Sequence, residues 1–475
     1  MIAANLATLH QSTRIQGGTT PRGTVFVVPS ASRLGLISVL TAAMVAVSCS
    51  SPNPDASWSL SFGGPERDMV YDMSTGPGEI YLAGEFSREP NIADDDPTPT
   101  GSWLGMVMRL SMEGEMLWQR PLPGATPGMA ITTLPLSDGV LVGGFSGEPQ
   151  QPWVATQALL AKFTPDGEVV WSKRIARLRH AIVYDLVLHD GRIFAVLGSA
   201  QLYTATATDA SEESVSEVAI VEFSTDGEIV FEHPVGHMLS QDSSYMLVSS
   251  GRHLIYAGDV LNQRSGGVDS EVIAFDNSFV ESWRTVLSDP YLVGISALAV
   301  GAAAGGGTPV VYVGGHFREQ LEVGGRSYRG VSGVRRNGFV AAIDAGGKVG
   351  QVVTLLPVDG GDWATVYSIA PLSNGSVLAV GEFLGGVDVS GTTLRSIGDL
   401  DSIVIMLNPG APLVATAYGT SVRDGFLLAK ELPDRSVVVV SALGGGRNDP
   451  NGEDVLIHHR APQSTSSNPY NSPAR

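Results

Sequence analysis

The sequence predicts an all-β fold, a seven-bladed β-propeller built from four-stranded antiparallel blades. Glycine contributes 57 of the 475 residues, and charged residues only 16%, which is more glycine and less charge than an average globular domain has. A short apolar run ending in glycine and an aromatic residue recurs along the chain, and a tight turn followed by an aromatic strand recurs with it. Four short strands in each repeat of roughly 40–60 residues describe a propeller blade.

Each repeat shows four segments in a fixed order. The first strand is clearest as MVYDM (69–73), IVYDL (182–186) and TVYSI (365–369). The second carries the glycine-aromatic signature, at 80–86, 139–145, 254–260, 310–317 and 376–383, with looser copies at 192–199 and 436–444. The third follows after a variable gap, at 105–111, 158–164, 217–224, 270–277, 338–345, 401–409 and 454–461.

The fourth strand ends in an aromatic residue and follows a tight turn. The turn is clearest as PDGEVVW, which ends at Trp171, and the other markers are Trp118, Phe231 and Trp283. Asp-Gly between two apolar runs is a strong hairpin signal, and we expect positive φ at both central residues.

The two ends of the repeat array predict how the ring closes. The seventh repeat stops after its third strand, whereas the array begins with an unpaired fourth strand, SWSLSFGG at 57–64. FGGPERD (62–68) and YGTSVRD (418–424) align as the same corner of a blade. We therefore expect seven blades over 57–461, closed by the N-terminal strand, because an open ring would leave unpaired strand edges. The polar tail 462–475 is expected to be disordered.

The first 48 residues are typical of a signal peptide of the lipoprotein type. They contain three arginines and no acidic residue, and a 14-residue apolar segment at 34–47 precedes Ser48 and Cys49. That segment is too short to span a bilayer as an ordinary helix. The run Ala46-Val47-Ser48-Cys49 resembles a bacterial lipobox, so we expect lipidation of Cys49 and a Pro/Ser-rich tether over 49–56. An ordinary signal peptide with an incidental cysteine is the alternative, and residues 1–30 suggest a true start codon further along.

The repeats resemble the SBBP-type β-propeller repeats of bacterial exported proteins. The resemblance rests on the glycine-aromatic second strand, on the hairpin TPDGEVVWSKRI (164–175) and on acidic corners such as PERDMVY (65–71). It covers roughly 57–420 and implies a propeller on a cell-surface or secreted protein. It implies no catalytic residue.

Loop lengths predict which face binds a partner. The connections between second and third strands are long, whereas most other turns are tight, and long loops in a compact fold are usually functional or disordered. We therefore expect a binding face formed by the loops 87–103, 200–216, 261–269, 318–337 and 384–400. The net charge of −19 argues against nucleic acid as a partner, because no basic stripe is present.

Three groups of residues are candidate ligand sites, each with a plainer alternative. Asp94, Asp95 and Asp96 form either a calcium site or a solvated acidic loop. Three aspartates that precede the first strand of a repeat form either a polar ring at the channel mouth that binds a metal or a sugar, or caps on the backbone N–H groups of their own turns. They are Asp68, Asp362 and Asp424. A basic loop forms either a site for an anionic glycan or lipid headgroup or an ordinary surface; its arginines are Arg318, Arg326, Arg329, Arg335 and Arg336.

No catalytic constellation is evident. The turn at 164–171 resembles the Asp box of sialidases, but its glycine directly follows the aspartate instead of coming two positions later. The single cysteine excludes the vicinal disulfide found in many quinoproteins. We therefore predict an outer-membrane or cell-surface lipoprotein that acts as a monomeric binding module for an unknown protein or glycan, without a cofactor. The alternatives are a diverged propeller hydrolase, lyase or quinoprotein, and a structural spacer. An enzyme would place a cluster of Asp, Glu, His and Arg with shifted pKa values at the channel mouth.

Overall fold

The fold is described from a computed structural model of the 475-residue chain. It describes residues 57–62, 68–86, 104–125, 127–148, 151–175, 181–199, 217–236, 244–262, 266–303, 307–408, 411–420, 423–444 and 453–460. The predicted signal peptide (1–48), tether (49–56) and tail (462–475) lie outside these ranges. In these ranges every regular secondary-structure element is a β-strand, and the strands are numbered β1 to β29.

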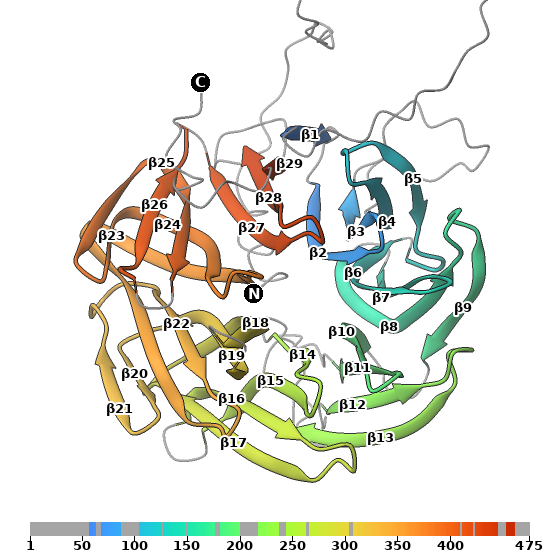
Figure 1. Ribbon diagram of the computed structural model, residues 1–475, viewed down its shortest axis with the longest axis horizontal. Coiled ribbons are helices and arrows are strands. Elements are labelled where there is room, and N and C mark those ends of the chain that lie inside the picture. The colour runs from blue at the N-terminus through green and yellow to red at the C-terminus, as the bar shows by residue number, and fades with distance from the viewer. Residues whose placement is uncertain are drawn as a thin grey trace, which may run out of the picture.

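The strands form six antiparallel sheets that surround a common centre, and this arrangement is a β-propeller (Figure 1). The prediction of an all-β propeller is confirmed. Three sheets have four consecutive strands. They are β2 (Met69–Gly76), β3 (Glu79–Phe86), β4 (Leu104–Ser111) and β5 (Met116–Pro121); β6 (Gly128–Leu136), β7 (Gly139–Glu148), β8 (Gln151–Phe163) and β9 (Val169–Ile175); and β10 (Ala181–His189), β11 (Arg192–Ser199), β12 (Val218–Phe223) and β13 (Ile229–Gly236).

A fourth four-stranded sheet joins distant parts of the chain. It contains β27 (Asp424–Glu431), β28 (Val437–Gly444), β29 (Glu453–Arg460) and β1 (Trp58–Phe62), and β1 pairs antiparallel with β29. Residues at the beginning and the end of the repeat array therefore lie side by side.

The remaining two sheets have more than four strands. The six-stranded sheet contains β14 (Met246–Ser249), β15 (Leu254–Leu261), β16 (Val268–Phe275), β17 (Glu281–Ser288), β20 (Gln320–Val323) and β21 (Arg326–Arg329). The seven-stranded sheet contains β18 (Val293–Ala303), β19 (Gly307–Phe317), β22 (Asn337–Ile343), β23 (Val349–Pro371), β24 (Val377–Val389), β25 (Thr392–Leu407) and β26 (Val414–Tyr418). Within it, the first part of β23 pairs with β22, and the later part pairs with β24.

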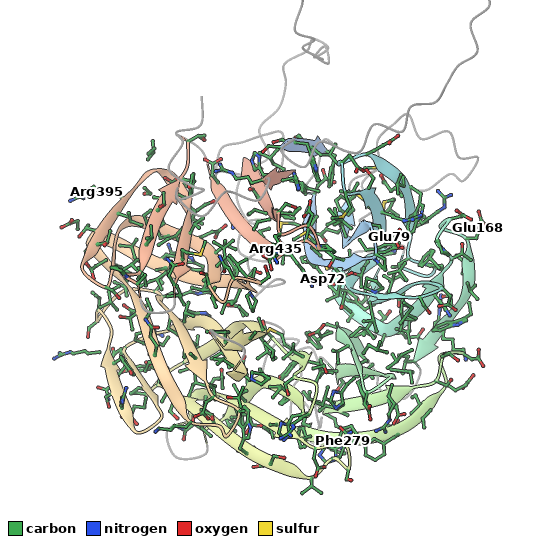
Figure 2. All side chains as sticks on the ribbon, in the orientation of Figure 1. Asp72, Glu79, Glu168, Phe279, Arg395 and Arg435 are labelled. Atoms are coloured by element: carbon green, nitrogen blue, oxygen red, sulfur yellow. The ribbon has the colours of Figure 1, made fainter. Side chains whose placement is uncertain are left out.

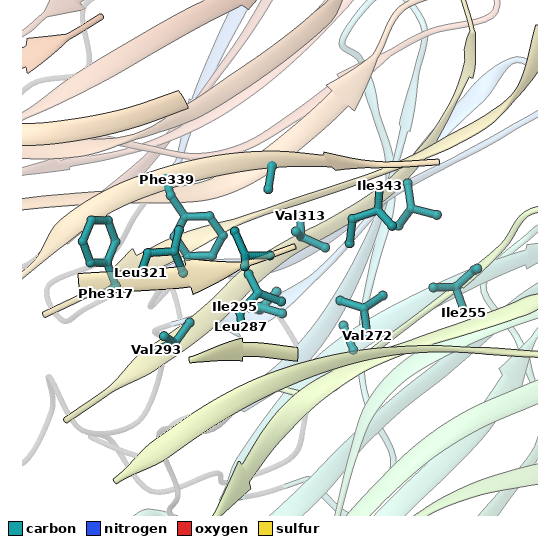
Figure 3. Packing of buried hydrophobic residues seen from close by; sticks show 14 of the residues in the cluster. Ile255, Val272, Leu287, Val293, Ile295, Val313, Phe317, Leu321, Phe339 and Ile343 are labelled. Carbon is teal, nitrogen blue, oxygen red and sulfur yellow. The ribbon is translucent and has the colours of Figure 1, made fainter. Parts of the chain in front are cut away.

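Side chains between neighbouring sheets form the core. Figure 3 shows one cluster, in which Ile255, Val272 and Leu287 of the six-stranded sheet pack against Val293 and Phe339 of the seven-stranded sheet. These side chains are at most 1% exposed. Burying one such side chain contributes about 1.5–3 kcal/mol, so contact between sheets is the main source of stability in this fold.

Most innermost strands carry a β-bulge at the same place. In β2 the register shifts between Val70 and Asp72, so that Tyr71 is unpaired, and in β10 the same shift leaves Tyr184 unpaired. Equivalent shifts occur in the four strands β6, β18, β23 and β27. A bulge adds twist and redirects a side chain, and here it turns the residue after it toward the next sheet.

The aromatic residues of the outer strands cover turns of the following sheet. Trp118 of β5 donates its indole N–H to the carbonyl oxygen of Pro165 at 2.7 Å. A Cβ on Gly167 of that turn would lie 2.9 Å from the Trp118 ring, so only glycine fits. The same contact joins Trp58 to Met112 and Trp171 to Thr225. The recurring Gly and Trp signals therefore describe one contact, repeated between sheets.

The expected geometry of these turns is partly wrong. Gly167 has a φ of +82°, but Asp166 is not in the positive region. A bulge between Lys162 and Phe163 absorbs the extra residue, as in the common three-residue hairpin loop. Positive φ at both central positions occurs instead at Asp190 and Gly191, with values of 50° and 73°.

Two of the long loops predicted to form the binding face are extra strands. Within 318–337, β20 and β21 form a hairpin, and β20 pairs with the outer strand β17 of the preceding sheet. Within 384–400, residues 386–389 of β24 pair with 355–358 of β23. Both insertions cover a strand edge that would otherwise be unpaired. The loops 87–103 and 200–216 lie outside the described residues.

Candidate functional site

The five arginines of the predicted basic loop do not form one cluster. Arg326 and Arg329 lie on the added strand β21 and are exposed. Arg318 lies with its guanidinium 5.3 Å from the ring centre of Tyr291. Arg335 and Arg336 directly precede β22, and their guanidiniums lie on the ring of Trp363. The five side chains therefore make different contacts, although the Arg318 carbonyl accepts a hydrogen bond from the side chain of the neighbouring Asn337 at 2.8 Å.

The three predicted corner aspartates do not occupy equivalent places. Asp68 and Asp424 each precede a bulged residue by three positions, and both are buried, at 1% and 7% exposed. Asp424 accepts hydrogen bonds from Thr420 N at 2.5 Å and Thr420 Oγ1 at 2.6 Å, which is the capping arrangement. Asp362 lies five positions before its bulge, is partly exposed, and pairs with Arg335.

The other predicted sites lie outside the described part of the chain. These are the lipidation site Cys49 and the candidate calcium ligands Asp94, Asp95 and Asp96. Among the described residues, no three His, Cys, Asp or Glu side chains gather as metal ligands. In the same residues, no helix is long and apolar enough to cross a membrane.

Ionisable side chains recur at one buried position of the second strands. The residue between the glycine and the last residue of the signature is Glu85 in β3, Asp259 in β15, His316 in β19 and Glu382 in β24. All four are at most 8% exposed. Burying a polar group is costly unless it has a hydrogen-bond partner, so the partners of each group decide its role.

Glu382 has one partner at the start of the next sheet, Arg423, and one in its own sheet, Tyr367. The Arg423 guanidinium lies 3.1 Å from Glu382 Oε1, and Tyr367 Oη donates to Glu382 Oε2 at 3.4 Å. Glu382 is completely buried. Burial raises the pKa of the Tyr367 hydroxyl, and the neighbouring Glu382 carboxylate raises it further. This position is therefore a satisfied ion pair.

His316 occupies the equivalent position one repeat earlier, but its surroundings differ. The ring is 2% exposed, and neither nitrogen has a hydrogen-bond partner among the described residues. Burial lowers the pKa of His316 well below its ordinary value, and the Arg336 guanidinium lowers it further. The imidazole is therefore neutral at pH 7, with one donor and one acceptor available.

Trp363 lies at the place in β23 that Arg423 occupies before β27, four residues before the bulge. The ring is 8% exposed, and its Nε1 has no partner among the described residues. The Arg336 guanidinium lies 3.9 Å from the centre of this ring, and that of Arg335 lies 5.1 Å away. Two cations therefore share one indole, a favourable cation–π arrangement.

Backbone hydrogen bonds fix this region. Arg335 N and Arg336 N both donate to the Asp362 carbonyl, at 2.8 and 3.3 Å, and Ala364 N donates to the Arg336 carbonyl at 3.1 Å. The Arg335 guanidinium also pairs with the Asp362 carboxylate, Nε to Oδ2, at 2.8 Å. We call His316, Arg335, Arg336, Asp362 and Trp363 the Trp363 site.

A second polar group lies on the inner wall. Asp72 is at the inner edge of its sheet (Figure 2) and accepts the backbone N–H of Thr133 in the next sheet at 2.7 Å. Burial raises the pKa of Asp72, partly offset by Lys430. Burial also raises the pKa of Asp185 to about 7, although the hydrogen bond from the backbone N–H of Leu247 lowers it, and the neighbouring Asp72 raises this pKa further. Both carboxylates follow a bulged tyrosine and link neighbouring inner strands.

Arg335, Arg336 and Asp362 were predicted as site residues, although in different groups, and the structure brings these three together. His316 and Trp363 were missed. A signal for His316 existed, because VVYVGGHF places an ionisable residue inside an otherwise apolar strand.

No family model matches the chain, and no curated protein matches it. The chain is similar to the Drosophila Semaphorin 1a extracellular domains 1–2, with 9% identity, a TM-score of 0.44, and coverage of 84% of this chain and 87% of that one. For the Drosophila Semaphorin 1b extracellular domains 1–2, the identity is 8% and the TM-score is 0.42, with coverage of 84% of this chain and 86% of that one. For a protein of unknown function from Dyadobacter fermentans, the identity is 12% and the TM-score is 0.40, with coverage of 84% of this chain and 97% of that one. Similarity at this level says nothing about a ligand.

Proposed function

We propose that the chain is an exported, lipid-anchored propeller of seven blades that acts as a binding module for an external ligand. The signal-peptide and lipobox features before Cys49 support the anchor at the outer membrane or cell surface. The resemblance to SBBP-type repeats supports an exported propeller. Membrane contact through the lipid and a protein or glycan partner remain part of this proposal.

Contacts between sheets support a count of seven blades. The strand β23 counts as the fourth strand of one blade and the first strand of the next, so that six sheets correspond to seven blades. Pairing of β1 with β29 supports closure by the N-terminal strand. The indole of Trp58 donates to the Met112 carbonyl of the adjacent sheet, just as the indole of Trp118 donates to the Pro165 carbonyl. Because Trp118 lies on the outer strand β5 of its sheet, this repeated contact supports β1 as the outer strand of its own sheet.

The observation that carries the binding proposal is the Trp363 site. His316 and the Trp363 indole are buried polar groups without partners among the described residues, beside two stacked guanidiniums. An unmade buried hydrogen bond costs about 1–3 kcal/mol. A ligand that supplies the missing partners would recover this free energy.

Thermal unfolding of the full-length protein tests the proposal. The panel contains calcium and other divalent metals, a quinone cofactor, and acidic and neutral glycans. A ligand at 100 times its dissociation constant stabilises by about 2.7 kcal/mol, a readily visible shift. A shift with a glycan supports the binding module, and a panel without any shift contradicts small-ligand binding.

A diverged propeller enzyme is the second candidate, and one specific observation favours it. Tyr367, Glu382 and Arg423 are joined by hydrogen bonds, and the charge of Arg336 acts on the shifted pKa values of both His316 and Tyr367. This is the kind of cluster that an enzyme would require. A shift with a metal or with quinone, together with turnover of a chromogenic ester or glycoside that E382Q abolishes, would establish the enzyme instead.

A further inference from the structure

We propose that the Trp363 site binds a single oxyanion group, such as a carboxylate, sulfate or phosphate. This inference rests on the proposed binding function, and it names the chemistry of the ligand. It also locates that ligand on one sector of the propeller, where β19, β22 and β23 meet.

The buried groups at the site favour an acceptor. The Trp363 Nε1–H can only donate, and neutral His316 offers a ring N–H. Both groups are more than nine-tenths buried and have no partner among the described residues. A carboxylate, sulfate or phosphate oxygen accepts from both kinds of donor, whereas a cation could accept from neither.

The charge at the site has the sign that an oxyanion needs. His316 pairs across the sheet with Gly338, two residues after Arg336, and Arg336 in turn forms a β-bridge with Trp363. The Arg336 guanidinium lies 3.9 Å from the centre of the Trp363 ring, and its charge lowers the pKa of His316. Hydrogen bonds between a guanidinium and an oxyanion are charge-assisted and roughly twice as strong as neutral ones. The chain has a net charge of −19, so the two adjacent arginines on the Trp363 ring form a locally positive region in an acidic protein.

The equivalent position one repeat later shows what the site lacks. There, Glu382 supplies a carboxylate to Arg423 from within the protein. At the Trp363 site the carboxylate is replaced by His316, and the arginine position by Trp363. The Asp362 carboxylate pairs with Arg335 on the more exposed side. An external oxyanion would therefore supply the negative charge that Glu382 supplies in the equivalent interface.

The test is a titration of the full-length protein with sodium sulfate, phosphate, acetate and glucuronate, each compared with chloride at equal ionic strength. Tryptophan fluorescence and thermal unfolding are the readouts. We expect at least one oxyanion to change the fluorescence and raise the Tm. R336Q should weaken its affinity at least tenfold, whereas the matched control R326Q, on the distant strand β21, should leave it unchanged.

Two conservative variants keep the result interpretable if R336Q folds poorly. W363F keeps an aromatic ring but loses both the N–H donor and the indole fluorophore, so the fluorescence change should disappear and the rise in Tm should become smaller. R336K retains the charge and should bind more tightly than R336Q. Tighter binding of glucuronate than of acetate would identify an acidic sugar as the source, and equal binding would identify a free oxyanion; both support the site.

Two outcomes overturn the inference. One is the absence of any oxyanion effect beyond that of chloride. The other is an equal effect in the wild type and in R336Q, which would place the anion elsewhere. A neutral glycan that binds wild type and R336Q equally would leave the proposed binding function intact while refuting this site.

Discussion

Asp185 on β10 accepts a 2.8 Å hydrogen bond from the backbone N–H of Leu247 on β14, and thereby joins the inner strands of two neighbouring sheets. Asp72 makes the equivalent bond to Thr133. Ser368 follows the same pattern, since its hydroxyl accepts the N–H of Ala429 at 3.2 Å. The motif Val-Tyr-Asp or Val-Tyr-Ser thus places a tyrosine at the bulge and an inter-sheet acceptor directly after it.

The stability of the protein should fall between about pH 4 and pH 7 because of Asp185. Its pKa of about 7 in the folded state lies above the ~3.9 of an unfolded aspartate, so in this window the folded state holds a proton that the unfolded state has lost. The contribution to the free energy of unfolding therefore decreases as the pH rises, by at most about 4 kcal/mol. Denaturant unfolding of the wild type and D185N across this range measures it. The decrease should be smaller in D185N, and a similar flattening in the exposed control D166N would contradict the assignment.

Arg423 should contribute more to the free energy of unfolding than an ordinary surface arginine does. R423M leaves the fully buried Glu382 carboxylate without its cation, and removing one partner of a buried pair costs about 3–5 kcal/mol. The double variant E382Q/R423M should recover most of this loss, as measured by chemical denaturation. Additive losses would show that the two side chains do not interact.

Trp58 should stabilise the whole propeller. Its indole donates to the Met112 carbonyl at 2.8 Å and stacks on His459 at 5.2 Å, so it connects β1 with two sheets. We expect W58A to reduce the free energy of unfolding by roughly 3 kcal/mol, and W58F by only about 1 kcal/mol for the lost hydrogen bond. Truncation of the exposed Ile397 serves as the control, and an unchanged Tm in W58A would argue against closure by β1.

Alanine substitutions at two glycines should distinguish the cost of a left-handed backbone from the cost of a steric conflict. Gly167 and Gly325 have φ values of +82° and +74°, but only a Cβ on Gly167 would collide with a neighbour, the Trp118 ring. G325A should cost about 1–2 kcal/mol for the left-handed conformation, and G167A should cost more because the indole must also move. Equal losses in thermal unfolding would mean that the Trp118 contact adds nothing.

The strands were predictable because their signals are local. Glycine-aromatic runs such as SVLAVGEF, and the VYD motif, identify a strand without any information about its neighbours, and each lies on a strand in the structure. The pairing of β20 with β17 could not be predicted, because it depends on an edge far away in the sequence. For the same reason, Arg326 and Arg336 looked like one cluster although the hairpin carries Arg326 to the rim.

The binding site was harder to predict than the fold. His316 and Glu382 occupy the same position in the repeat, and the sequence shows both as single polar residues in apolar strands. What distinguishes them is the residue that the next sheet presents, Trp363 or Arg423, and this pairing appears only when the sheets are assembled.

The strand β23 extends over 23 residues, from Val349 to Pro371, but it turns in its middle at Asp359 and Gly360, which have φ values of 52° and 87°. Backbone hydrogen bonds from Arg335 and Arg336 to the Asp362 carbonyl, and from Ala364 to the Arg336 carbonyl, fix the residues on either side of Trp363 after this turn. Groups mounted on such a stiff frame lose little conformational entropy when a ligand arrives. This sector can therefore act as a preorganised receptor, with recognition that depends on chemistry already in place rather than on loop closure.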